Sequence, residues 1–315
     1  MLDSKKQYKG VYMMKFIMAY LVVAIHTTDW HLMGLLDTAV PYFFLASGFF
    51  LFRKLGRSRE EDLAVIKQWI GKVLKLYLIW TLVYLPFTVI GFMQDGLSLQ
   101  MAFAVFVRNL VLVGENYLSW PLWYLLAMIW GGILIYVMRW MRLPVCGMFL
   151  AGLALYLAAF LLDLDSVSLY IKLFKTTRNG FFLGLMFLTA GGLVWQWMQQ
   201  DRLQKPQFWD MGLAVLSFVG YQYSPLFLLP LALGLFLLSL RMELLVLSDD
   251  SARSLGSMSK TIYLTHMIFA GLAILLTAIP EGWPLWLLAA ACSTALAGLF
   301  AGPLKGTRLN QVLFA

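Results

Sequence analysis

Two ionisable side chains, Lys15 and His26, lie within the first apolar stretch of this sequence. In a helix, their spacing of 11 residues turns through about 1100°, or three turns and roughly 20°, so both side chains share one face. The rise between them is about 16 Å. An ammonium group suits anion binding, and an imidazole suits proton transfer near neutral pH. Each residue also has an ordinary interpretation: His26 as a packing or interfacial histidine, and Lys15 as a lysine that reaches back to the polar surface.

A second group of cations, Lys67, Lys72 and Lys75, opens a later apolar stretch. Lys72 and Lys75 are three residues apart and would be neighbours on one face of a helix. Adjacent ammonium groups repel each other unless an anion lies between them, and phosphate groups would serve. These phosphates belong either to a ligand or to lipid head groups, and the spacing alone does not decide between the two.

Three further positions place polar groups beside small or aromatic residues. Ser47 precedes a glycine, and this small pair would let another helix or a ligand approach closely. Arg178 stands where another apolar stretch begins. Tyr263 and His266 are three residues apart, so they would lie on one face of a helix.

The remaining histidine and the cysteines do not suggest a metal or disulfide site. The three histidines, His26, His31 and His266, are too scattered to suggest a zinc site, and Cys146 and Cys292 fall in different apolar segments. This pattern matches neither a metal site nor a disulfide framework.

The elements that must position these residues are membrane helices. Of the 315 residues, 61% are apolar and 13% are charged, and the mean hydropathy is +0.79. Soluble domains average about 45–50% apolar and about 25% charged residues. The excess lies in blocks of about 18–25 residues, long enough to cross about 30 Å of hydrocarbon. We therefore expect an all-α polytopic membrane protein of about ten transmembrane helices, with residues 1–315 forming a single membrane domain.

The hydropathy pattern predicts approximate spans, which are 11–29, 37–54, 68–93, 118–140, 144–163, 178–199, 207–222, 225–243, 259–279 and 283–303. The segment 98–113 is apolar but short and contains Arg108, which is typical of an interfacial or re-entrant helix. The charged segment 57–62 is expected to be a solvated loop.

Lysine and arginine gather on one side of the predicted spans, as they do in cytoplasmic loops. The positive residues on this side are Lys5, Lys6, Lys9, Arg53, Lys54, Arg57, Arg59, Lys67, Arg139, Arg142, Arg202, Lys205, Arg241, Arg253, Lys260, Lys305 and Arg308. This distribution predicts that both termini are cytoplasmic. It also accounts for the net charge of +8 without nucleic-acid binding.

Six short motifs, in order along nearly the whole chain, resemble the acyltransferase-3 family of integral membrane acyltransferases. They are Lys15 with ten residues before His26, the stretch from Pro41 to Gly48, Lys72-Val-Leu-Lys75, Leu122 to Leu125, Arg178 to Gly184, and Ser259 to His266. Each motif is short, but their shared order makes the resemblance fairly specific.

The sequence departs from the family pattern in two ways. Lysine stands at Lys15, Lys72 and Lys75 where arginine is commoner, and lysine offers a point charge rather than a fork for two phosphate oxygens. The carboxylate that many members carry after the Leu-Trp element is also missing. In lacking this carboxylate, the sequence resembles the branch of the family that contains the membrane part of the serine racemase of vancomycin-type resistance.

The resemblance implies a multi-pass enzyme of the bacterial cytoplasmic membrane that modifies cell-envelope polysaccharide. Such an enzyme moves an acyl group, often acetyl, from cytoplasmic acyl-CoA to a hydroxyl of an extracytoplasmic acceptor, commonly a cell-surface glycan. Lys15, Lys72 and Lys75 would hold the CoA phosphates, and the pantetheine arm would present the thioester near His26, the general base. Acyl-CoA would be the donor substrate, and no permanently bound cofactor or metal is needed.

The resemblance also indicates where the acceptor would bind. The side chains expected to contact substrate are Arg178, Ser47, Tyr263 and His266. Ser47, or a backbone amide near Gly48, would stabilise the tetrahedral oxyanion. Three side chains are candidates to orient the His26 imidazole, and the sequence does not choose among them: Asp29, Glu115 and Tyr42.

Two other functional classes remain open. A polar line of Lys15, His26 and His266 through a helical bundle would also suit a transporter of serine or another small solute, although no inverted repeat or pair of broken helices supports a carrier. A non-catalytic scaffold would give the aligned Lys15 and His26 no purpose. The acceptor stays open among glycan, peptidoglycan, a lipid-linked intermediate and an amino acid, and succinyl is an alternative to acetyl.

Overall fold

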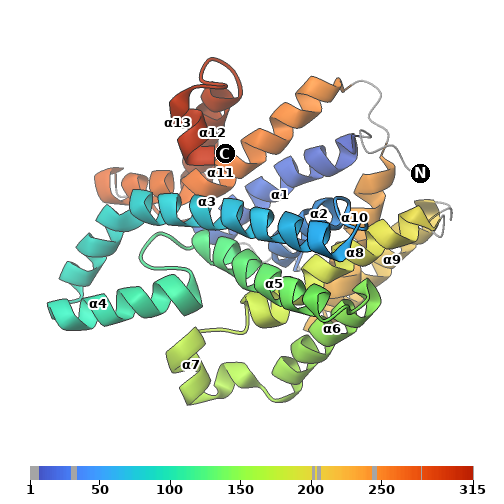
Figure 1. Ribbon diagram of the computed structural model, residues 1–315. Helices are drawn as coiled ribbons and strands as arrows, with labels where there is room; N and C mark the ends of the chain where they lie inside the picture. Colours follow the sequence, from blue (N-terminus) through green and yellow to red (C-terminus); the bar gives the residue numbers. More distant parts are fainter. Residues whose placement is uncertain are drawn as a thin grey trace. The chain divides into compact units, whose positions relative to one another are not determined.

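The computed structural model describes residues 7–29, 34–200, 203, 207–242, 247–277 and 279–314, which form helices and short connections (Figure 1). Of the residues used above, His31, Lys5, Lys6, Arg202 and Lys205 lie outside the described ranges. The chain divides into two compact units. Unit 1 comprises the residues up to Phe49 and Val194–Phe314, and unit 2 comprises Phe50–Leu193 with the last residue of the chain. That residues 1–315 act as a single domain stays a prediction.

Unit 1 contains the first and last helices of the chain. Its elements are α1 (Lys9–Thr27), η1 (Leu36–Thr38), most of α2 (Ala39–Phe52), the end of α8 (Leu185–Gln199), α9 (Gln207–Tyr221), η5 (Pro225–Phe227), α10 (Leu228–Arg241), α11 (Asp249–Thr277), α12 (Trp283–Ala301) and α13 (Arg308–Phe314). Within this unit α1 packs on α11, α11 on α12, and α9 on α10.

Small residues and one ion pair join α9 to α10. A Cβ atom on Gly234 would lie 2.8 Å from the backbone nitrogen of Ala214, so the two helices approach more closely than any larger side chain allows. Close backbone approach of this kind drives helix association in membranes, where apolar burial gives little preference. Arg241 also forms an ion pair with the buried Asp210, with Nε 2.5 Å from Oδ2.

Unit 2 contains the helices between these two parts of unit 1. Its elements are α3 (Arg59–Gln94), α4 (Leu99–Arg108), the π-helix η2 (Asn109–Val113), α5 (Leu122–Trp140), α6 (Val145–Leu161), η3 (Leu164–Ser166), α7 (Ser168–Phe174), the π-helix η4 (Gly180–Gly184) and the start of α8. Helices α3 and α5 run side by side (Figure 1). Gly132 permits their contact, because a Cβ atom there would lie 2.8 Å from the ring of Trp69.

Helix α3 begins earlier than the predicted span. Ser58 caps it by accepting a hydrogen bond from the Glu61 N–H at 3.2 Å, and three acidic side chains in the first turn complement the helix dipole. Its 36 residues rise about 54 Å, so the helix extends well beyond a hydrocarbon layer of about 30 Å.

The expectation that the charged segment 57–62 is a loop is wrong from Arg59 on, because α3 begins there, and the expectation that it is solvated is wrong for Asp62. This side chain is 1% exposed and belongs to α3. It accepts a hydrogen bond from the Gly56 N–H at 2.8 Å and forms an ion pair with Arg139 of α5 at 2.5 Å. A buried carboxylate needs such partners, and this pair joins two helices of unit 2.

All ten predicted spans coincide with helices in the described part of the chain. Six helices there are long and apolar enough to cross a membrane: α1, α3, α5, η4 with α8, α11 and α12. The other four spans match the shorter apolar helices α2, α6, α9 and η5 with α10. The prediction of an all-helical polytopic membrane protein is confirmed.

The short segment after α3 forms α4 and η2. Helix α4 has ten residues, about 15 Å of rise, and exposes Leu99 and Phe103. Gly114 ends the segment at a φ of 88°, and a Cβ atom there would lie 2.6 Å from the Cα of Trp123, so the turn requires glycine. An interfacial or re-entrant position for this segment stays a prediction.

Candidate functional site

Helices α1 and α11 run in parallel within unit 1 (Figure 1). Their packing brings two histidines together. Near the N-terminal ends of the two helices, the ring of Tyr12 packs directly on Gly256. A Cβ atom on Gly256 would lie only 2.6 Å from Cδ1 of this ring. Further along, the rings of His26 and His266 stack with centroids 5.4 Å apart and planes 20° apart. Two residues 240 positions apart in the chain therefore form one imidazole pair.

His266 lies fully buried, with a defined tautomer. Its Nδ1 is 3.2 Å from the carbonyl oxygen of Ile262, which can only accept, so Nδ1 carries the proton in this hydrogen bond. Nε2 then bears a lone pair, and this atom has no hydrogen-bond partner among the described residues. Tyr263 packs edge-on against His266, and its ring also contacts Phe43 of α2 at 5.6 Å. The site thus contains a buried hydrogen-bond acceptor, Nε2 of His266.

The cytoplasmic half of the same helix pair, on the predicted topology, contains two lysines. Lys15 on α1 and Lys260 on α11 are both half-buried, and their charges repel each other. Lys260 donates a hydrogen bond to the backbone oxygen of Phe314 and lies over that ring, 5.8 Å from its centroid. Lys15, His26, Tyr263 and His266 therefore all belong to the α1–α11 pair.

Ser47 is half-buried on α2, also in unit 1. Of the three candidates to orient His26, Tyr42 bonds to the Ser239 hydroxyl at 2.6 Å, and Ser239 in turn donates to the Phe236 oxygen. The Tyr42 hydroxyl is therefore the donor to Ser239. Asp29 lies just after α1 and is exposed.

The other predicted donor-binding residues, Lys72 and Lys75, belong to unit 2. Both are exposed on α3, and the apolar side chains of Leu74, Leu78 and Leu82 beside them are exposed as well. A basic residue among exposed apolar side chains fits contact with lipid head groups as well as contact with ligand phosphate. The two interpretations of this lysine pair therefore both remain.

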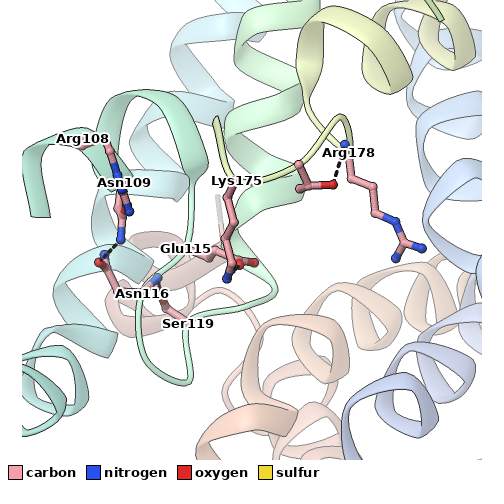
Figure 2. A network of polar contacts seen from close by, with 8 residues as sticks. Arg108, Asn109, Glu115, Asn116, Ser119, Lys175 and Arg178 are labelled. Atoms are coloured by element: carbon pink, nitrogen blue, oxygen red, sulfur yellow. Dashed lines mark hydrogen bonds and ion pairs between the residues drawn. The ribbon is translucent and has the colours of Figure 1, made fainter. Parts of the chain in front are cut away.

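Figure 2 shows a cluster of polar side chains in unit 2, which come from the end of α4, from η2 and the loop after it, and from the connection after α7. Arg108 donates to the Asn109 side-chain oxygen through Nε and Nη2, at 2.9 and 2.7 Å, and to the Lys172 backbone oxygen at 3.0 Å. Asn109 donates to the side chain of Asn116 at 2.8 Å. On the predicted topology this cluster lies on the extracytoplasmic side.

The same cluster contains Glu115, the third candidate to orient His26. Its carboxylate forms an ion pair with Lys175, with Nζ 2.5 Å from Oε1. Arg178 is exposed, and its side chain points away from this ion pair (Figure 2). Arg178 therefore presents its guanidinium at the extracytoplasmic edge of unit 2 on the predicted topology.

The residues after Arg178 have a structural role that sequence reasoning missed. Asn179 is buried, caps η4 by accepting from the Phe181 N–H at 3.0 Å, and donates to the Tyr170 hydroxyl at 2.8 Å. Partial burial raises the pKa of Tyr170 to about 12, so this phenol stays neutral. A Cβ atom on Gly180 would lie 2.5 Å from the Ala127 oxygen, so only glycine fits against α5. The Arg-Asn-Gly motif thus fixes the position from which Arg178 projects.

Sequence reasoning also missed Lys260 as a member of the site. It stands six residues before His266 within a motif already recognised, but its relation to Lys15 depends on how α11 packs on α1. The charge of Lys260 is the available signal in the sequence, but the same charge also fits the orientation of the membrane helices.

Comparisons with known proteins agree with the motifs. A family model described as an acyltransferase domain matches residues 8–302. An amino-acid racemase of Enterococcus faecalis is 30% identical over 220 residues, which cover 61% of this chain and 29% of that protein. A serine/alanine racemase of Enterococcus gallinarum is 28% identical over 225 residues, covering 62% of this chain and 30% of that protein. This chain thus aligns with less than a third of the length of either relative. No solved structure matches it.

The family match spans parts of both units and confirms the resemblance carried by the six motifs. The two racemases agree with the branch that the missing carboxylate indicates. The chain belongs to the acyltransferase-3 family of membrane acyltransferases.

Proposed function

We propose that this protein transfers an acyl group, acetyl by default, from cytoplasmic acyl-CoA to a hydroxyl of an extracytoplasmic acceptor such as a cell-surface glycan. The observation that carries the proposal is the stacked pair of His26 and His266 in a chain of this family. Ionisable groups inside membrane spans are costly, and they are retained where they serve a function. The same helix pair contains Lys15, about 16 Å of helix rise from His26, which is of the order of the reach of a pantetheine arm.

In the proposed reaction His26 is the general base. It accepts the proton of the acceptor hydroxyl while the hydroxyl oxygen attacks the carbonyl carbon of the thioester. The tetrahedral intermediate then breaks its carbon–sulfur bond, and the CoA thiolate takes the proton from the imidazolium. The products are an acyl ester and the CoA thiol, so His26 returns to its neutral form.

His266, Tyr263, Ser47 and Arg178 have supporting roles in this proposal. His266 packs on the face of His26, and its Nε2 lone pair would accept a hydrogen bond from bound substrate. Tyr263 restricts the position of His266 by edge-on contact. Ser47 would stabilise the oxyanion, and Arg178 would meet the incoming acceptor.

Charge reversal at Lys72→Glu with Lys75→Glu is expected to weaken acetyl-CoA binding at least about tenfold at low salt, because each change places like charge against phosphate. The effect should shrink at about 0.5 M salt as screening increases. Isothermal titration of acetyl-CoA into the purified protein measures both values. Lys67→Glu is the matched control, since it is an exposed cation earlier on the same helix. Unchanged affinity in the double variant would show that these lysines contact lipid head groups.

Inside-out membrane vesicles test the function as a whole, because their outer surface presents the cytoplasmic side to added acetyl-CoA. Vesicles containing the protein should incorporate labelled acetyl groups into base-labile esters of lumenal material, and vesicles without it should not. The name of one relative, a serine/alanine racemase, makes serine the solute for the competing assay. Serine accumulation by proteoliposomes, together with no ester formation, would favour a transporter over the proposed transferase.

A further inference from the structure

The cations near the N-terminal ends of α1 and α11 fall into two groups. Lys9 has a carboxylate partner, Asp249, at 3.1 Å and also donates to the Leu247 oxygen at 2.6 Å. Arg253 pairs with Asp250 at 2.5 Å, and this contact lowers the pKa of the exposed Asp250 carboxyl. Each of these two cations therefore has a carboxylate partner at the N-terminal end of α11.

Lys15 and Lys260 are different. Within the described part of unit 1, no carboxylate forms an ion pair with either lysine, although both side chains are half-buried. The charge that acts on Lys15 is the like charge of Lys260. Burial of two repelling ammonium groups in adjacent membrane helices is unfavourable unless an anion joins them.

The helix packing places these lysines at one level. Tyr12 of α1 contacts Gly256 of α11, so these two residues lie at the same level along the two parallel helices. From this level, Lys15 is about 4.5 Å further along α1 and Lys260 about 6 Å further along α11. Lys15 is rotated by about 60° from Tyr12, and Lys260 by about 40° from Gly256, so both start near the faces that the helices share.

The C-terminal helix holds Lys260 in place. The Lys260 ammonium donates to the Phe314 backbone oxygen and lies over the Phe314 ring, which packs on Phe300 of α12 with centroids 4.9 Å apart. This arrangement uses one of the three N–H donors of Lys260. Two donors remain for a ligand, and Lys15 contributes three more.

We propose that Lys260, with Lys15, forms a binding site for the phosphate groups of acyl-CoA between α1 and α11. The inference rests on the proposed function and adds Lys260 to it as a donor-binding residue. The site lies in the N-terminal halves of both helices, on the side of the membrane that is predicted to be cytoplasmic, where acyl-CoA is available. A phosphate of an anionic lipid is the other source of the same chemistry.

Binding of acetyl-CoA and of acetyl-pantetheine, which lacks the phosphates, tests the assignment in uncharged detergent. Lys260→Met keeps most of the aliphatic stem and removes the charge, as does Lys15→Met. Each variant should weaken acetyl-CoA binding about tenfold or more, since a charged hydrogen bond is lost, and should leave acetyl-pantetheine binding within about twofold. Lys260→Arg should keep most of the affinity for acetyl-CoA. Lys9→Met is the control, because it removes a cation of the same helix pair that already has a carboxylate partner.

The outcomes separate this inference from the proposed function. If wild type binds acetyl-CoA and Lys260→Met binds it equally well with normal thermal stability, Lys260 has no donor-binding role although the proposed function stands. If instead phosphatidylglycerol stabilises wild type but not Lys260→Met, while acetyl-CoA affinity is unchanged, the site binds lipid and the inference is overturned. If wild type binds no acyl-CoA, the proposed function is contradicted, and so is this inference, because it rests on that function. If Lys260→Met does not fold, Lys15→Met tests the same site, and unchanged acetyl-CoA affinity in that variant would overturn the inference.

Discussion

Replacement of His26 by alanine is expected to lower acyl transfer by about 10²- to 10⁴-fold, the usual contribution of a general base. Acetyl-CoA affinity should change by less than about twofold, because the proposed phosphate contacts are about 16 Å of helix rise away. The loss should therefore appear in kcat rather than in the binding constant. Ester formation in inside-out vesicles and titration of the purified variant measure the two quantities separately.

Two controls make this result specific to proton transfer. His26→Gln preserves a polar side chain of similar size but cannot act as a base, so it should be as inactive as His26→Ala. Added imidazole should restore part of the transfer by the alanine variant, because the vacated space admits a small base. Transfer at the wild-type rate by either variant would remove His26 from the mechanism.

The second large expected effect is a loss of stability on removing one partner of the ion pair between Asp62 and Arg139. The size of this loss should depend on which partner is removed. Asp62 is 1% exposed and Arg139 is 31% exposed. Arg139→Ala leaves a buried carboxylate without its charge partner and should lower the free energy of unfolding by about 3–5 kcal/mol. Asp62→Ala leaves an arginine that can turn toward water, so its cost should be smaller.

Thermal unfolding in detergent, followed by tryptophan fluorescence, measures the two variants and the double variant. The double variant Asp62→Ala with Arg139→Ala should be more stable than Arg139→Ala alone, because no unpaired charge remains buried. Arg57→Ala is the control, since its contact with Glu61 is 3.8 Å long and exposed, and such pairs contribute about 0–1 kcal/mol. The explanation is wrong if Arg139→Ala unfolds at the control temperature.

The spans were predictable because long apolar blocks specify membrane helices on their own. The predicted span 283–303, for example, corresponds to α12, Trp283–Ala301. The shared face of Lys15 and His26 was also predictable, since it depends on the helical repeat within one segment. The beginning of α3 was missed because its first turn is charged, and hydropathy identifies the part of a helix in lipid rather than its whole length.

Contacts between helices were not predictable from local pattern. Glu115 pairs with Lys175 across 60 positions, and Asp62 pairs with Arg139 across 77. No helical or strand repeat brings residues so far apart in sequence into contact. Each of these contacts depends on how separate segments of the chain pack. The stack of His26 on His266 is of the same kind. One sequence could identify both histidines as unusual, but only the packing of α1 on α11 joins them.

The most direct test of the proposed transferase is acetyl-CoA binding and slow hydrolysis by the purified protein, wild type against His26→Ala. In the absence of an acceptor, water should replace the hydroxyl, and general-base catalysis by His26 should give slow release of CoA. We predict that wild type binds and hydrolyses acetyl-CoA and that His26→Ala binds it without hydrolysis. If neither protein binds any acyl-CoA, including succinyl-CoA, the transferase proposal is contradicted, and serine uptake becomes the activity to measure.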